Sequence, residues 1–155
     1  MKLKVLIQAE VIDLDKEHRL LQDSDGSVGA IATFYGTVRD SNENRSVQSI
    51  FIEHYSGMTE TKLKKIINEA KERWKISAAT IIHRIGKLEV GEGIVFVGTA
   101  SSHRKDAFQS CDFIMDYLKT NAPLWKKERH DRGEDWVSSK ESDQIFARSW
   151  KKGGD

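Results

Sequence analysis

The sequence predicts mixed α and β structure, in the α/β (α+β) class. One observation predicts it. The spacing of apolar residues switches several times between the period of 2 that is typical of strands and the period of 3.6 that is typical of helices. The chain has 155 residues, enough for one hydrophobic core, and shows no repeat or interdomain linker. We therefore predict a single domain over residues 1–150 and a flexible C-terminal tail over residues 151–155.

Local patterns define each element of the N-terminal half. Alternating apolar residues predict a half-buried first strand, and β-branched and aromatic residues predict two later strands. Gly26, in a run of Asp and Ser, breaks a short helix. Apolar residues on one stripe predict a longer helix. The predicted order is a strand over residues 3–11, a helix over 15–21, a strand over 29–38, a polar loop over 39–46, a strand over 47–55 and a helix over 59–74.

The C-terminal half begins with two apolar strands, over residues 79–85 and 94–100, with a glycine-containing stretch between them. Ser101 and Ser102 are expected to cap a long helix that ends before Pro123. A strand over residues 124–130, a turn at Arg132–Gly133 and an amphipathic segment ending near Trp150 follow. The long helix is predicted to bury the following residues: Ala107, Phe108, Cys111, Ile114, Met115 and Leu118.

Composition limits the class of function. The chain has 25 basic and 24 acidic residues and a net charge of +1, so we expect no nucleic-acid partner and only local anion sites. The single cysteine, Cys111, rules out an internal disulfide framework and is typical of a reducing compartment. The first residues are too charged for a signal peptide, and no apolar run approaches bilayer length. We therefore expect a cytoplasmic protein without a membrane partner.

The stretch around Pro123, the only proline, predicts an anion site. A helix must stop near this residue, so Lys119 in its last turn and Lys126 just beyond it can point at one place. A lysine that is partly desolvated beside other cations has a lowered pKa, which suits nucleophilic or acid–base catalysis. A charged, solvated helix end would show the same pattern.

Alternation in the following strand separates two faces. Lys126 and Glu128 share a polar face, and Trp125 and Lys127 take the opposite, packing face. We therefore expect Glu128 to lie beside Lys126.

Two further clusters favour an anion. His103 and Arg104 follow Ser101 and Ser102 at a predicted helix N-terminus, where free N–H groups and the helix dipole attract negative charge. Gly36 interrupts a strand that Arg39 closes, and a strand glycine often marks close approach of a ligand or another backbone. A solvated helix cap and a hydrated strand end are the alternative interpretations.

The histidines do not form a metal-binding signature. His83, His103 and His130 are too scattered for a zinc site, and His54 and His83 lie on predicted strands, where we interpret them as structural. Cys111 lies on the apolar stripe of a helix and is expected to pack as a small apolar residue. We predict no metal and no thiol nucleophile.

Several motifs in one order resemble a known family. They are Phe34-x-Gly-x-Val-Arg39, Glu53-His-Tyr-x-Gly-Met58, Ile82-His-Arg-Ile-Gly86, Ser102-His-Arg104, Lys119-x-x-Ala-Pro-x-Trp-Lys-Lys-Glu128 and Trp136-Val137. Together they resemble the large catalytic subunit of molybdopterin synthase, in register from about Gly29 to Trp150.

The resemblance implies an α/β hammerhead-type fold with additional antiparallel strands, which forms a homodimer within a heterotetramer. It implies a small partner subunit with a ubiquitin-like fold and a Gly-Gly thiocarboxylate tail. The implied reaction transfers two sulfur atoms to cyclic pyranopterin monophosphate and forms the dithiolene of molybdopterin, with no cofactor.

The resemblance also implies roles for single residues. Lys119 would be the principal catalytic lysine, with Lys126 as a second. The implied substrate-binding residues are Phe34, Thr37, Val38, Arg39, His103, Arg104, Lys127, Glu128 and Lys140.

Three positions depart from the family pattern. Thr37 replaces a frequent lysine, and Leu124 replaces a frequent phenylalanine. Lys140 stands where the family often has an arginine that reaches the neighbouring subunit's pocket, so a bidentate phosphate contact is in question there. Two rival functions stay open on the sequence: a noncatalytic module that grips a ubiquitin-like tail, and a phosphate-ester or nucleotide-binding enzyme unrelated to sulfur.

Overall fold

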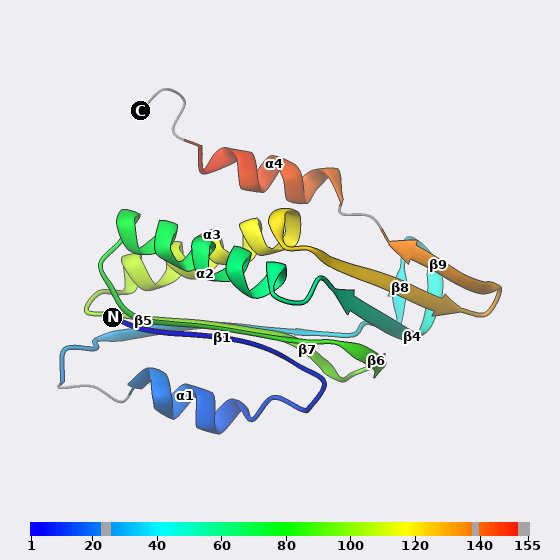
Figure 1. The fold of residues 1–155 in the computed structure, drawn as a ribbon, viewed down its shortest axis with the longest axis horizontal. Coiled ribbons are helices and arrows are strands. Elements are labelled where there is room, and N and C mark those ends of the chain that lie inside the picture. Colours follow the sequence, from blue (N-terminus) through cyan, green and yellow to red (C-terminus); the bar gives the residue numbers. More distant parts are fainter. Residues whose placement is uncertain (23–25, 138–139, 152–155) are drawn as a thin grey trace.

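The computed structural model describes residues 1–22, 26–137 and 140–151, which form two β-sheets and four helices (Figure 1). The sheet that contains more residues, called the larger sheet below, has four strands in the order β1-β5-β7-β2, and the smaller sheet has five strands that are shorter on average. Its strands are β1 (Lys2–Gln8), β2 (Ala30–Thr37), β5 (Ile76–Arg84) and β7 (Gly93–Ser101). β1 runs parallel to β5, and the other pairs are antiparallel. The mixed α/β (α+β) prediction is confirmed.

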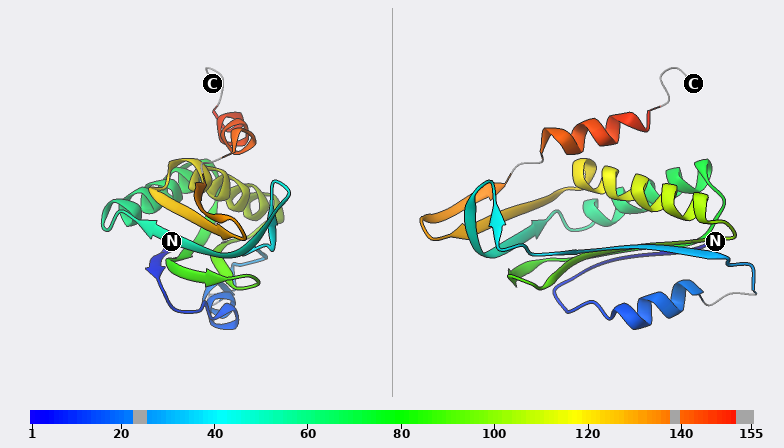
Figure 2. Two further views of the ribbon diagram at one scale, coloured as in Figure 1. Left: turned by 90° about the vertical axis from the view of Figure 1, so that its right-hand side faces the viewer. Right: turned by 180° about the vertical axis from the view of Figure 1, so that it is seen from behind.

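The smaller sheet lies at one end of the molecule (Figure 2). Its central strand, β4 (Arg45–His54), pairs with three others, and β9 (Gly133–Val137) pairs with β8. The three partners of β4 are β3 (Ser41–Asn42), β6 (Gly86–Glu89) and β8 (Leu124–His130). This sheet and the end of the larger one enclose the cavity described below.

Helices cover both faces of the larger sheet (Figures 1 and 2). α1 (Leu14–Gln22) lies on one face, and α2 (Met58–Arg73) and α3 (Arg104–Asn121) lie side by side on the other. α4 (Glu141–Ser149) forms a further layer against α3. None of these helices combines the length and the apolar character that crossing a bilayer requires.

The main core lies between the larger sheet and α2 and α3. β5 and β7 are central strands covered on both faces, which explains their nearly continuous apolar sequences. Phe113 of α3 is fully buried and packs against Trp74 and Trp150, with ring centroids 5.3 and 5.7 Å away. A smaller cluster that includes Val38 and Leu88 lies beneath β4.

Several boundary predictions are wrong. The first strand ends at Gln8 rather than Val11. The predicted loop over residues 39–46 contains a tight hairpin between β3 and β4, because Glu43 and Asn44 both adopt positive φ (51° and 63°). β6 and β9 are additional strands that the sequence did not predict. Both are short and pair at the margins of the smaller sheet.

The predicted start and inner face of the long helix also need correction. Ser101 belongs to β7, and Ser102 donates its hydroxyl hydrogen to the Ser27 carbonyl, so His103 is the N-cap residue and has no side-chain capping bond. Phe108 is 65% exposed rather than buried. The predicted stop before Pro123 is confirmed, since α3 ends at Asn121. The predicted break after the first helix includes residues 23–25, and the predicted C-terminal tail includes residues 152–155; both stretches lie outside the described residues.

Candidate functional site

A cavity of about 270 Å³ opens where the smaller sheet meets the C-terminal end of α3. Four cationic side chains line it: Arg39, Lys119, Lys126 and Lys140. They come from the segment after β2, the last turn of α3, β8 and the N-cap of α4. Asn42, His83 and Asp143 also line it, and the remaining wall residues are apolar. Cations from distant parts of the chain that face one partly enclosed space attract an anion.

Pro123 places two of these lysines. Ala122, the residue before it, is extended (φ −78°, ψ 133°), which ends α3 and starts the connection to β8. In β8, Lys126 pairs with Ile52 of β4. Lys119 lies in the last turn of α3, where the helix dipole favours a cation. Lys119 and Lys126 therefore line one cavity, as the sequence predicts.

Lys126 is electrostatically strained by this arrangement. Burial lowers its pKa below the usual value for lysine, and repulsion by Lys119 lowers the pKa further. Attraction by Glu128 raises it, and Arg39 and Lys140 add smaller lowering effects. A lowered pKa increases the fraction of neutral amine, the form that attacks an acyl carbon or accepts a proton.

Glu128 is buried beside the cavity, with 8% of its surface exposed. Its Oε2 accepts a hydrogen bond from Asn42 Nδ2 at 2.9 Å. A carboxylate can only accept such a bond, so the Asn42 amide is oriented with Nδ2 toward Glu128. Asn42 Oδ1 is buried and has no hydrogen-bond partner among the described residues. The hairpin between β3 and β4 thus joins the cavity wall through Asn42.

The opposite face of β8 carries Lys127. Its ammonium lies 3.7 Å from Glu134 and 4.7 Å from the centroid of the Trp136 ring. Lys127 lines a separate groove on the smaller sheet rather than the cationic cavity. The predicted separation of Lys126 from Lys127 is confirmed, whereas Trp125 lies half-exposed at the cavity instead of packing in a core.

The segment from Phe34 to Arg39 reaches the cavity only through its last residue. Phe34 is 40% exposed on β2, Thr37 is the last residue of that strand, and Val38 is buried in the small core beneath β4. The space beside Gly36 is taken by Val95, whose Cγ1 would lie 2.9 Å from an added Cβ. The predicted close approach at this glycine is therefore to β7.

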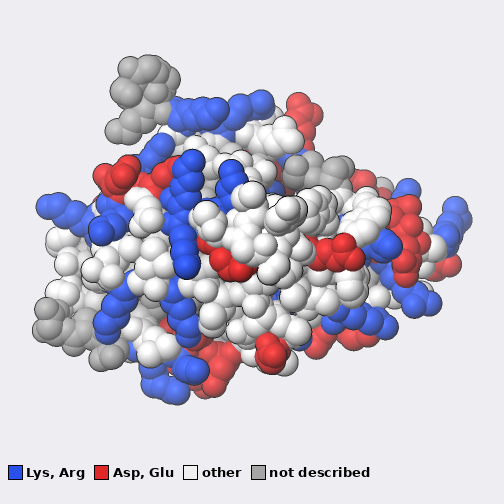
Figure 3. Space-filling model, viewed as in Figure 1, with Lys and Arg blue, Asp and Glu red and all other residues white. Residues whose placement is uncertain are grey.

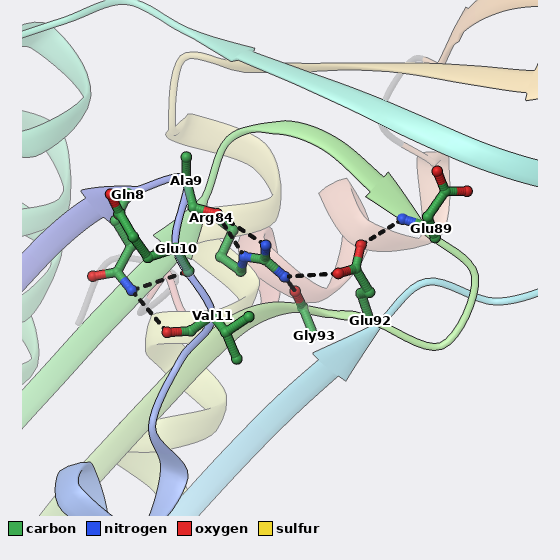
Figure 4. A network of polar contacts seen from close by, with 8 residues as sticks. All are labelled: Gln8, Ala9, Glu10, Val11, Arg84, Glu89, Glu92 and Gly93. Atoms are coloured by element: carbon green, nitrogen blue, oxygen red, sulfur yellow. Dashed lines mark hydrogen bonds and ion pairs between the residues drawn. The ribbon is translucent and has the colours of Figure 1, made fainter.

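A buried arginine holds this segment indirectly. Arg84, 7% exposed, donates two hydrogen bonds to the Ala9 carbonyl and one to the Gly93 carbonyl (Figure 4). It also lies 3.8 Å from a carboxylate oxygen of Glu92. The network joins the chain after β1 to the turn before β7 (Figure 4).

That turn is bonded to the residue that precedes Arg39. Val38 donates its N–H to the Glu92 carbonyl at 2.9 Å and accepts a hydrogen bond from the Gly91 N–H at 2.8 Å. Gly91 has φ +89°, a conformation that glycine adopts most readily. Arg84 therefore contributes, through Glu92 and Gly93, to the position of Arg39.

His103 and Arg104 do not reach the cavity within one chain. They lie at the N-terminal end of α3, and 15 residues of helix at about 1.5 Å each separate Arg104 from Lys119 by about 22 Å. Both side chains are exposed. Within a single copy, the two predicted basic clusters are thus at opposite ends of one helix.

Sequence reasoning missed Asn42 and Asp143 as cavity residues and interpreted His83 as structural. Asn42 lies in the segment predicted as a loop, and Asp143 is one of several acidic residues on an amphipathic helix. His83 interrupts an apolar strand, which is the one signal that could have indicated a role for it. Across residues 1–22, 26–137 and 140–151, no group of three or more His, Cys, Asp or Glu side chains gathers as a metal site.

Charge on the outer surface is mixed. On the face shown in Figure 3, blue basic and red acidic side chains lie interspersed with uncharged ones. This agrees with the net charge of +1 and leaves the cavity as a local concentration of cations.

Comparison with known proteins identifies the family. The model of the MoaE protein family matches residues 7–121. The chain belongs to the MoaE family. It is 48% identical over 148 residues to the molybdopterin synthase catalytic subunit of Pseudomonas aeruginosa, covering 96% of this chain and 99% of that protein. Its identity to the Escherichia coli protein of the same name is 46% over 147 residues, covering 95% and 97%.

A solved MoaE structure shares the fold. The molybdopterin biosynthesis MoaE protein from Burkholderia ambifaria superimposes with a TM-score of 0.81 at 46% identity, over 96% of this chain and 98% of that one. The fold expected from the resemblance is therefore confirmed.

Proposed function

We propose that this MoaE chain is the catalytic subunit of a molybdopterin synthase, a sulfurtransferase of molybdenum cofactor biosynthesis. It transfers two sulfur atoms from the C-terminal thiocarboxylate of a small ubiquitin-like subunit to cyclic pyranopterin monophosphate, which forms the molybdopterin dithiolene. The small subunit is the partner protein of this catalytic subunit and supplies the sulfur. A cytoplasmic location and a single domain over residues 1–150 are parts of the proposal.

The observation that carries the proposal is the cavity with its four cations. A cyclic phosphate and a thiocarboxylate are both anions, and bringing them together in water-depleted space requires positive charge from the protein. Lys119, Lys126, Arg39 and Lys140 supply it from four separate elements.

In each transfer, the thiocarboxylate sulfur forms a bond to a substrate carbon, and a carbon–oxygen bond of that carbon breaks; the oxygen leaves as the phosphate when the cyclic ester opens, or as water. Water or the Lys119 amine then attacks the acyl carbon, so that the bond from the acyl carbon to sulfur breaks and the sulfur stays on the substrate. Hydrolysis regenerates the tail as a carboxylate. Lys119 is the principal catalytic lysine, as nucleophile toward the acyl carbon or as proton donor and acceptor. Lys126, with its lowered pKa, assists it. Glu128 attracts the charge of Lys126 and accepts a hydrogen bond from Asn42.

Substrate binding is assigned to the residues around these lysines. Arg39 binds the phosphate, and its planar guanidinium suits a bidentate contact. Lys140 adds charge at the cavity. Thr37 and Val38 contribute through the backbone that leads to Arg39. Lys127 lines a separate groove on the smaller sheet, so we leave it out of this binding site.

His103 and Arg104 reach the substrate from a second copy of the chain. β2 is an edge strand of the larger sheet, and no strand of the described part of the chain pairs with its outer edge. Phe34 on β2 and Phe108 on the adjoining α3 are 40% and 65% exposed. Such an edge favours pairing with another copy.

A twofold pairing across β2 joins the two clusters. Ala30 of β2 pairs with Ser101, next to the start of α3, whereas Thr37 pairs with Gly93, at the end near the cavity. Antiparallel contact between two copies of β2 therefore places the His103–Arg104 end of one copy beside the Lys119 end of the other. The homodimer thus supplies each cavity with two further cation-forming side chains.

The test is reconstitution. The purified chain is mixed with thiocarboxylated small subunit and cyclic pyranopterin monophosphate, and dithiolene formation is followed. A small subunit with an ordinary carboxylate tail is the control. Product that depends on the thiocarboxylate supports the proposal, and no product from an intact complex would refute it.

A further inference from the structure

His83 presents an unused hydrogen-bond acceptor to the cationic cavity. Its imidazole is 7% exposed, and Nδ1 lies 2.8 Å from the Arg84 carbonyl oxygen. A carbonyl oxygen only accepts, so Nδ1 carries the proton of the neutral ring. The lone pair is then on Nε2, for which the described residues provide no hydrogen-bond partner. The backbone therefore fixes the tautomer.

The ring stays neutral because of its surroundings. The pKa of His83 is lowered to about 4, chiefly by burial; the hydrogen bond to the Arg84 carbonyl opposes this shift, and the nearby Lys119, His54 and Lys126 add smaller lowering effects, with Lys119 first among them. These groups approach from α3, β4 and β8, while Arg39, Lys140 and Asp143 line the same cavity. At neutral pH, His83 thus adds no fifth positive charge to the cavity.

An ammonium or amine in this cavity needs an acceptor. Lys119 carries N–H donors, and an unheld lysine side chain has four flexible torsions. Glu128 already accepts from Asn42 on the β8 side. His83 Nε2 and Asn42 Oδ1 are both neutral acceptors on residues that line the cavity, and the charge of Lys119 acts on His83. His83 can therefore hold the Lys119 amine without cancelling the positive charge that an anionic substrate requires.

We propose that His83 is a positioning residue for Lys119: its Nε2 lone pair accepts a hydrogen bond from the Lys119 amine and aims it at the acyl carbon of the thiocarboxylate tail. The inference rests on the proposed sulfur transfer and adds a residue to it. It replaces the interpretation of His83 as merely structural.

Two substitutions separate the two ring nitrogens. In His83→Asn, the side-chain amide N–H can occupy the place of Nδ1 and keep the bond to the Arg84 carbonyl, but nothing replaces Nε2. In His83→Gln, the longer side chain places its amide oxygen near the position that Nε2 occupies in the wild type, so the acceptor is kept.

We expect His83→Asn to lower kcat about ten- to a hundredfold, with little change in KM for the pterin, since small misplacements of a reacting group have effects of that size. His83→Gln should retain most of the turnover.

The third variant tests whether His83 acts through Lys119. In a Lys119→Ala background, adding His83→Asn should change the residual rate by less than about twofold, because the residue that His83 positions is already absent. A full additional loss in the double variant would overturn the inference. So would equal loss of turnover in His83→Asn and His83→Gln, or wild-type turnover in His83→Asn.

Two controls complete the design. Thermal unfolding of each variant shows whether the fold survives, and a fall in kcat that merely follows a fall in Tm across the variants counts against positioning. An inactive wild-type complex would overturn the proposed function and this inference with it, whereas an active wild type with an unaffected His83→Asn would overturn the inference alone.

Discussion

Replacing Arg84 with lysine tests the network that supports Arg39. The guanidinium reaches two carbonyls in different segments, with Nε and Nη2 at 3.1 and 2.9 Å from Ala9 O and Nη1 at 3.2 Å from Gly93 O. A lysine ammonium lacks this planar fork and cannot serve both acceptors with the same geometry. Arg84→Lys keeps the charge, so any effect reports the lost geometry.

The expected cost follows from these contacts. A buried carbonyl left without its donor costs about 1 to 3 kcal/mol, and the hydrogen bonds to a charged donor are worth about 1.5 to 3 kcal/mol each, without full additivity. The contact with Glu92, at 3.8 Å and half-exposed on the carboxylate side, adds little. We expect a loss of about 3 kcal/mol in the free energy of unfolding, which lowers Tm by about 6 to 12 °C for a chain of this size.

Urea unfolding at fixed pH and salt measures this loss. Lys87→Ala is the matched control, because Lys87 forms an exposed ion pair with Glu89 at 3.5 Å and its removal should change stability by less than about 0.5 kcal/mol. Arg84→Lys should also weaken substrate binding through the displacement of Arg39. A variant within about 0.5 kcal/mol of the wild type would refute the structural role given to Arg84.

Three further predictions concern the cavity and its assembly. Arg39→Ala should weaken binding of cyclic pyranopterin monophosphate by about 1.5 to 3 kcal/mol, the value of one charged hydrogen bond; calorimetry at fixed salt measures this, and unaltered affinity would remove Arg39 from the phosphate site. Mixing Lys119→Ala subunits with Arg104→Ala subunits should restore about a quarter of wild-type turnover. About half of randomly formed twofold dimers are mixed, and each mixed dimer holds one intact site, with Lys119 from one subunit and Arg104 from the other. No recovery of turnover after subunit exchange would place Arg104 outside the neighbouring cavity. The free energy of unfolding should fall by up to about 3 kcal/mol as pH drops from 6.5 to 4. Over this range the unfolded chain binds a proton at His83, whereas the folded chain, in which the pKa of His83 is depressed to about 4, does not yet bind it. His83→Gln should flatten this part of the curve, and an unchanged slope in urea titrations would contradict the buried, neutral imidazole.

Sequence patterns predicted the elements that bury a regular face and missed those that do not. β5, β7 and α2 carry regular apolar patterns and were predicted within a few residues. α3 was harder, because it is buried on two sides: Phe113 packs against Trp74 and Trp150, while Phe108, on the predicted stripe, is exposed. A single stripe cannot describe a helix with two packing partners.

Some residues of the cavity could likewise be predicted from local sequence, and others could not. The proline that ends α3 fixes where Lys119 and Lys126 lie, so local sequence was enough to bring them together. His83 and Asn42 were not recognised, because their place at the cavity depends on the pairing of β5 and β4 with distant strands. The resemblance grouped His103 and Arg104 with the lysines, but no sequence pattern indicates that within one copy they lie at the opposite end of α3 from Lys119.

Single-turnover formation of molybdopterin by the Lys119→Ala variant tests the central claim most directly. The variant is compared with the wild type and with Lys71→Ala, which removes an exposed lysine from α2. We expect Lys71→Ala to match the wild type and Lys119→Ala to lose product formation by at least about a hundredfold, while it still binds the thiocarboxylated small subunit. Wild-type turnover in Lys119→Ala would contradict the assignment of the cationic cavity as the site of sulfur transfer.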